Sequence, residues 1–100
     1  PLLSQRLLEE LLSSSSRDRG ELMALLVQGV HQDLIDQAHK IKGAARIVQA
    51  RALAEQCEVL EQIGEGADPA QVDTWVKAIE KAMFDLEQVL QQQLDSLPPH

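Results

Sequence analysis

The sequence of 100 residues has no tyrosine, one tryptophan, one phenylalanine and one cysteine. Aromatic and β-branched residues fill strands, so their scarcity argues against a sheet. The single Cys57 excludes an internal disulfide and is compatible with a reducing compartment. The sequence has no apolar run of the ~18 residues that a membrane span needs, and it shows no signal peptide. Because it starts at Pro1 without a methionine, we expect a fragment of a longer protein.

Basic residues are also few. Nine Lys and Arg stand against sixteen Asp and Glu, which gives a net charge of -7. Binding to nucleic acid requires clustered Lys or Arg that displace the counterions of the phosphates. We therefore expect no nucleic-acid partner for this domain, and its acidity disfavours contact with an anionic membrane surface.

The residues that are abundant favour helices. Leu, Ala, Gln and Glu dominate the composition, and all four are good helix formers. One hundred residues can build one modest core, so residues 1–100 are expected to form a single domain. The predicted fold class is all-α.

Apolar spacing and capping residues place the helices. Leucines at helical spacing open the chain, and the run "SSSSRDR" is expected to end that first short helix. Asp18 and Glu21 resemble a capping box for the next helix, and Gly64 is expected to end a later helix in the left-handed conformation. Asp68 and Pro69 are expected to begin the last one. The first helix is expected over about residues 2–13, and the second ends near Gly29. The third is expected to start around His31 to Asp33, the fourth carries Leu53 to Ile63, and the last runs from Pro69 until Pro98. This pattern predicts an antiparallel four-helix bundle with an additional short N-terminal helix.

The stretch "QAHKIKGAARIVQA", residues 37–50, carries an unusual histidine. At ~100° per residue, five apolar residues share one narrow sector of this helix. They are Leu34, Ala38, Ile41, Ala45 and Val48. His39 lies ~140° from the centre of that sector, so its ring is predicted to face solvent.

Two neighbours of His39 suggest what that exposed ring does. Gly43 lies one turn further on, where glycine costs a helix ~1 kcal/mol relative to alanine. Its small size either leaves room for another molecule beside His39 or allows close packing of a neighbouring helix. Lys42 is three residues after His39, which brings their Cβ atoms to ~5–6 Å. Its ammonium is suited to binding a phosphate.

Positive charge is concentrated around the same helix. Residues 37–54 contain four of the nine basic residues and no acid. A cation near a helix C-terminus is favourable, which accounts for Arg46 but not for Lys40 and Lys42. Ile35 lies close to the His39 face, either as an exposed apolar contact for a partner or as a boundary residue covered by the first helix.

An exposed, neutral imidazole has a free ring nitrogen that can act as a nucleophile. No serine accompanies His39, and Cys57 is on the core face of its own helix, so a catalytic triad is not predicted. Asp36 and His39 have the spacing of one half of a di-metal motif, but such a bundle needs the motif twice. A metal site is therefore not expected. The remaining interpretation is a histidine that itself takes up a phosphoryl group beside a lysine.

The segment "AHKIKGAARIV" resembles the signature of histidine-containing phosphotransfer (Hpt) domains, and "LAEQCEVLE" resembles the helix that follows it in that family. The resemblance is strongest to the C-terminal Hpt domains of sensor histidine kinases of the BvgS and EvgS type. It implies that His39 accepts a phosphoryl group from a receiver-domain aspartate and passes it to another. It further implies that Lys42 holds the phosphate oxygens and that Gly43 leaves room for the receiver.

The resemblance also assigns secondary roles. Glu61 would accept a hydrogen bond from Nδ1 of the histidine, unless it is an ordinary solvated glutamate, and Arg46 would support the site. Ile35, Lys40 and Ala44 would contact the receiver. The domain would have no kinase activity and no cofactor, because the Mg²⁺ needed for transfer lies on the receiver. Relatives commonly have glycine where this chain has Gln49, so the end of that helix is uncertain.

The expected setting is the cytoplasm, in a parent kinase anchored in the inner membrane. The chain has enough helices to build the bundle alone, so we expect a monomer. The alternative is a non-catalytic helical adaptor or dimerisation module, in which the amphipathic first helix pairs with a partner helix.

Overall fold

The computed structural model describes residues 4–64 and 66–98. These residues form four helices and no strand. The helices are α1 (Gln5–Gln28), α2 (His31–Ile47), α3 (Arg51–Ile63) and α4 (Pro69–Asp95). Each helix packs on two others, since α1 and α3 both contact α2 and α4. The predicted all-α bundle is therefore confirmed. Within the described ranges no helix has the length and apolarity to cross a membrane.

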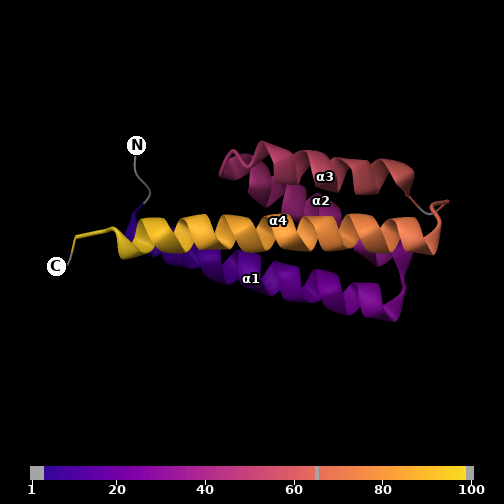
Figure 1. Ribbon diagram of the computed structural model, residues 1–100, viewed down its shortest axis with the longest axis horizontal. Coiled ribbons are helices and arrows are strands. Elements are labelled where there is room, and N and C mark those ends of the chain that lie inside the picture. Colours follow the sequence, from indigo (N-terminus) through magenta and orange to yellow (C-terminus); the bar gives the residue numbers. More distant parts are fainter. Residues whose placement is uncertain (1–3, 65, 99–100) are drawn as a thin grey trace.

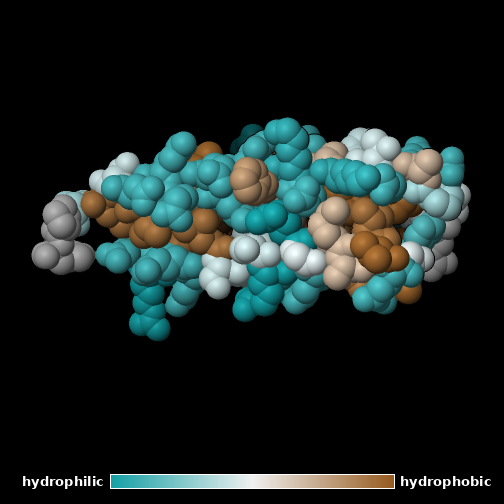
Figure 2. All heavy atoms as spheres, turned by 60° about the horizontal axis from the view of Figure 1, so that its bottom comes forward, coloured by the Kyte–Doolittle hydropathy of each residue, from teal (hydrophilic) through white to brown (hydrophobic). Residues whose placement is uncertain are grey.

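The helices differ in length, and this gives the molecule its shape. In Figure 1, α1 and α4 lie side by side along the long axis, and the shorter pair α2 and α3 covers part of their length. The start of α1 and the end of α4 extend together beyond that pair. Figure 2 shows a mostly hydrophilic face with an apolar stripe at this extended end.

The predicted break in the first helix is wrong. Residues 2–13 and 19–29 were expected to be separate helices, but α1 continues through "SSSSRDR". Serine is only a few tenths of a kcal/mol less favourable in a helix than good helix formers. Packing of the side chains therefore determines whether the helix continues through the serine run. One row of α1 continues at spacings of three and four through the serine run, namely Leu8, Leu11, Ser15, Asp18, Leu22 and Leu25. The expected additional short helix is thus the first half of α1.

Polar contacts hold the middle of α1 against α4. Glu87 on α4 is 6% exposed. Its carboxylate accepts hydrogen bonds from Ser15 Oγ at 2.9 Å and from Arg19 Nε and Nη2 at 2.9 and 3.0 Å. The Arg19 guanidinium also lies 5.3 Å from the centroid of the Phe84 ring. These bonds satisfy a buried charge and explain why the serine run does not interrupt the helix.

Most of the predicted helix ends are confirmed. Asp68 accepts a hydrogen bond from Ala70 N at 3.3 Å, and Pro69 is the first residue of α4. Gly29 ends α1 in the left-handed conformation. Gly64 follows α3 with a φ of 54°, but its ψ of -153° lies outside the left-handed helical region that was expected.

The core lies between all four helices. Four of the five predicted residues of this face are core residues of α2, namely Leu34, Ala38, Ile41 and Ala45. The fifth, Val48, follows the end of α2 and is half-buried. Facing them are Leu53, Cys57 and Leu60 from α3, Leu22 from α1, and Val72, Val76, Ile79 and Met83 from α4. This packing fixes the rotation of α2 about its axis and therefore the direction of every other α2 side chain.

Candidate functional site

His39 projects from the middle of α2 into solvent. Its side chain is 74% exposed, whereas the preceding Ala38 is completely buried. The prediction that the ring faces water is therefore correct. An imidazole this accessible can be reached by a group on another protein.

Glu61 from α3 contacts the inner nitrogen of that ring. Because α2 and α3 are packed side by side and joined by a short turn, the end of α3 lies against the first half of α2. Glu61 Oε1 is 3.2 Å from His39 Nδ1. An ionised carboxylate can only accept, so Nδ1 carries the hydrogen and donates. The free lone pair is then on Nε2, on the outer side of the ring.

Lys42 lies behind this pair. The residue is only 8% exposed, and its Nζ donates to Glu61 Oε2 at 2.8 Å. Burial alone raises the pKa of the Glu61 carboxyl, but the hydrogen bond and charge of Lys42, together with His39, outweigh burial and lower it. Glu61 is therefore ionised at neutral pH. The ammonium of Lys42, which the sequence analysis assigned to phosphate oxygens, is bound to this carboxylate in the structure.

Gly43 leaves open space next to His39. It is exposed, and a Cβ built on it would meet no atom within 4 Å among the described residues, apart from its own helix backbone and chain neighbours. The alternative that Gly43 permits close packing of a neighbouring helix is therefore wrong. Its lack of a side chain clears the surface instead.

Lys40 is directed toward α1. Its Nζ lies 3.3 Å from Asp18 Oδ1 and 3.8 Å from Glu21 Oε2. Asp18 is 4% exposed, and its backbone oxygen accepts a hydrogen bond from Gln37 Nε2 at 3.0 Å. The two acids predicted to form a capping box instead bind α2. The sequence reasoning missed this role, although Asp18 stands in the apolar row of α1.

The remaining predicted surface residues differ in exposure. Ala44 is exposed and Ile35 is half-buried, so the structure leaves part of Ile35 for a partner. Lys40 and Lys42 are both neutralised by carboxylates. The site is thus less positive than the sequence suggested.

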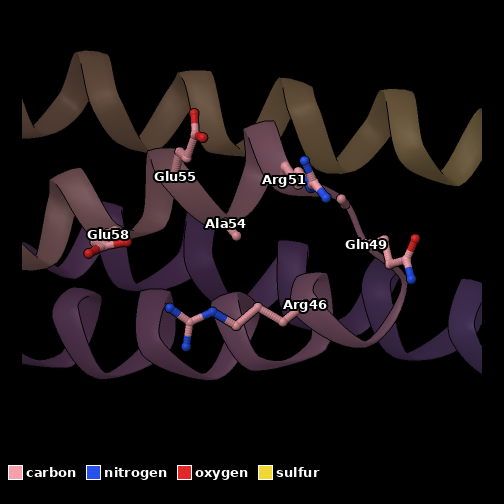
Figure 3. Close-up of a pocket in the computed structure, with 7 residues that line it drawn as sticks. Arg46, Gln49, Arg51, Ala54, Glu55 and Glu58 are labelled. Carbon is pink, nitrogen blue, oxygen red and sulfur yellow. The ribbon is translucent and has the colours of Figure 1, made fainter.

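Arg46 near the end of α2 and Arg51 at the start of α3 are both exposed. They line an open pocket of about 390 Å³ with Gln49, Ala50, Ala54, Glu55 and Glu58. In Figure 3 the Arg46 side chain runs along α2, away from the turn. No carboxylate of residues 4–64 and 66–98 lies within 4.0 Å of either guanidinium.

The turn between α2 and α3 settles the uncertain boundary. The helix α2 ends at Ile47, and Gln49 has a φ of 60°. A non-glycine residue therefore has a positive φ in this turn. The helix α2 does not extend through Gln49.

Metal binding and thiol chemistry are the alternatives to a reactive histidine. The described part of the chain has no group of three or more His, Cys, Asp or Glu arranged to hold a metal ion. Cys57 is buried, and this burial, with the negative charge of Glu61, raises its pKa to about 12 against the opposing effect of Lys42. Its thiol is not a nucleophile at neutral pH. His31 is half-buried at the start of α2, and His100 lies outside the described residues.

Comparison with known proteins agrees with this geometry. The family model described as "Hpt domain" matches residues 6–98. The chain is 32% identical over 98 residues to the virulence sensor protein BvgS of Bordetella bronchiseptica, and 31% identical to the proteins of the same name from Bordetella parapertussis and Bordetella pertussis. Each match covers 96% of this chain but only 8% of the relative. No solved structure matches the chain.

Proposed function

The chain belongs to the Hpt domain family and acts in phosphorelay phosphotransfer, and on this premise we propose that His39 is the residue that carries the phosphoryl group. The observation that supports this most is the exposed ring with its inner nitrogen bound to Glu61. The bond leaves Nε2 as an outward-facing nucleophile.

The reaction follows from this arrangement. Nε2 attacks the phosphorus of an aspartyl phosphate on a receiver domain, a new N–P bond forms, and the P–O bond to the aspartate breaks. The aspartate leaves as a carboxylate. The ring becomes positively charged as it bonds to phosphorus, and the Glu61 carboxylate on Nδ1 stabilises that charge. Transfer to a second receiver reverses these steps.

Partner access depends on the surface around His39. Hpt domains in two-component systems interact with receiver domains. The cleared space over Gly43 admits the receiver, and Ala44 and the exposed part of Ile35 contact it. The Mg²⁺ for transfer is supplied by the receiver. The domain works as a monomer in the cytoplasm, and its parent is a sensor kinase anchored in the inner membrane.

Phosphoryl transfer from a receiver tests the assignment. An isolated receiver domain charged with radiolabelled acetyl phosphate is mixed with the chain and with two variants. Wild type and His31→Gln are expected to take up label that is labile in acid and stable in base, whereas His39→Gln takes up none. Equal labelling of His39→Gln and wild type would refute the assignment.

A further inference from the structure

Ile47 is a large apolar residue at the end of α2 that remains 80% exposed. At ~100° per residue it lies ~140° from the centre of the core sector, as far from it as His39, and Gly43 lies between the two. The distance along the helix axis from His39 to Ile47 is ~12 Å. The outward face of α2 therefore runs from the histidine, over the cleared space at Gly43, to an exposed isoleucine.

The position of Ile47 matters more than its exposure, because single exposed apolar side chains are common on soluble proteins. A protein interface of standard size covers about 800 Å² of each partner, which corresponds to a patch with a radius of roughly 16 Å. A receiver centred on His39 would therefore also cover Ile47. Ile35, on the same helix before His39, is half-buried and has less apolar surface left to bury. Ile47 offers the larger apolar contact.

The pocket at the turn between α2 and α3 lies on the same face of this helix pair. Its lining on α3 includes Arg51, Ala54 and Glu58. These residues precede Glu61 at spacings of three and four residues, which places all of them in one row of α3. Because Glu61 contacts His39, the pocket lies beside the phosphoacceptor, nearer the turn. Its volume of about 390 Å³ is large enough to admit a side chain of a partner.

The cations of this pocket differ from most others in the chain. Six of the nine Lys and Arg residues have an acid within 4.0 Å, namely Arg6, Arg19, Lys40, Lys42, Lys77 and Lys81. Arg46 and Arg51 have none among residues 4–64 and 66–98. Glu55 and Glu58 line the same pocket (Figure 3) without pairing with either arginine. A guanidinium binds a carboxylate through two parallel hydrogen bonds, so the pocket suits an acidic side chain from outside.

We infer that the end of α2 is a second anchor for the receiver, in which Ile47 packs against an apolar residue of the receiver while Arg46 and Arg51 bind an acidic side chain that enters the pocket. The inference rests on the proposed receiver partner and on His39 as the site of phosphate. The anchor takes no part in the chemistry and sets the affinity for the receiver. It favours receivers that carry an acidic residue beside an apolar one, because any other surface would leave the arginines unpaired or Ile47 uncovered.

Saturation kinetics measure the apolar part of the anchor. Phosphoryl transfer to the chain is followed over a range of concentrations of an isolated receiver domain charged with acetyl phosphate. Ile47→Ser is expected to raise the receiver concentration at half-maximal rate by ~10-fold, which is the effect of losing a buried apolar contact. The maximal rate is expected to stay within ~2-fold of wild type, because the contact is equally present before and during transfer. Ile47→Leu keeps the apolar surface and is expected to restore the wild-type concentration dependence.

Salt dependence measures the charged part. The double variant Arg46→Gln/Arg51→Gln is expected to raise the half-maximal receiver concentration by ~10-fold at low ionic strength. Its difference from wild type is expected to shrink at high salt, because salt screens exposed charge pairs. The loss in Ile47→Ser is expected to persist at high salt, since it removes an apolar contact.

Matched controls come from α4, which lies diagonally across the bundle from α2. Val89→Ser removes an apolar residue that is 48% exposed, and Lys81→Gln removes an exposed cation. Both are expected to show the wild-type concentration dependence, and an equal loss in them would overturn the inference. Circular dichroism melting identifies any variant that is unfolded, and Ile47→Ala then replaces Ile47→Ser.

The outcomes separate this inference from the proposed function. Wild-type half-maximal concentrations in Ile47→Ser and in the double arginine variant would overturn the inference alone. Labelling of wild type by phosphoramidate, a small donor that needs no receiver, is measured in parallel. If neither phosphoramidate nor the receiver labels His39, the proposed function fails and the inference fails with it.

Discussion

At the scale of single residues, Gly43 weakens its helix while clearing space beside His39. A Cβ at this position would meet no described neighbour, so Gly43→Ala is expected to stabilise the domain by ~0.5–1 kcal/mol. Gly43→Trp is expected to fold with nearly the same melting temperature but to block phosphorylation by a receiver. Phosphorylation by phosphoramidate should persist in Gly43→Trp, because that donor is small. An unfolded Gly43→Trp would show that the space is needed for packing.

The lowered pKa of Glu61 predicts that the stability of the domain depends on pH. Its pKa is lowered in the folded state by Lys42 and His39 despite burial, so its ionised form contributes stability above the ordinary glutamate pKa of ~4.3. That contribution is lost as pH falls through the lower, folded pKa. The difference in free energy of unfolding between wild type and Glu61→Gln, from urea denaturation, should therefore be largest near neutral pH and shrink in acid. A difference that stays constant into strong acid would contradict this.

At the scale of the helices, α1 depends on partners from the far end of the chain. Arg19 and Ser15 both bind Glu87, which is buried on α4. Arg19→Met would leave this carboxylate without its cation, and breaking such a pair costs ~3–5 kcal/mol. Thermal or urea unfolding measures the loss.

The double variant Arg19→Met/Glu87→Met provides the comparison. It removes both charges and is expected to recover most of the stability, because no buried charge remains. A double variant as unstable as Arg19→Met would show that packing, and not the unpaired carboxylate, causes the loss.

The helices also show what sequence can and cannot predict. Asp68 and Pro69 were identified correctly because a helix cap is a local feature. The continuity of α1 was missed because the groups that stabilise its serine run are more than 60 residues away in sequence.

The exposure of residues near the core boundary was equally hard to predict. A helical angle places His39 correctly, because ~140° from the core centre puts its ring on the side of α2 that faces away from the core. Lys42 is only ~80° from that centre, and whether it is exposed depends on what α3 contributes there. Glu61 covers it, which the angle alone does not show.

At the scale of the whole molecule, Cys57 reports on the integrity of the core. It is completely buried, and its pKa is raised to about 12 by burial and by Glu61, with Lys42 opposing. Iodoacetamide is therefore expected to leave it unmodified in the folded protein and to label it only at the rate of unfolding. Mass spectrometry over a urea series measures this. Rapid labelling without denaturant would mean that the four helices do not close over the core as described.

The phosphorelay account requires both the buried core of this bundle and the exposed surface that carries His39. Four helices from one chain bury one face of α2 and leave His39 exposed on the other. The bound Nδ1 and free Nε2 then determine where phosphate attaches.

Phosphorus NMR of the phosphorylated protein tests this most directly, because the two phosphohistidine isomers give different signals. The account predicts a single signal from phosphate on Nε2, which is absent in His39→Gln. Phosphate on Nδ1, or a signal that persists in His39→Gln, would contradict it.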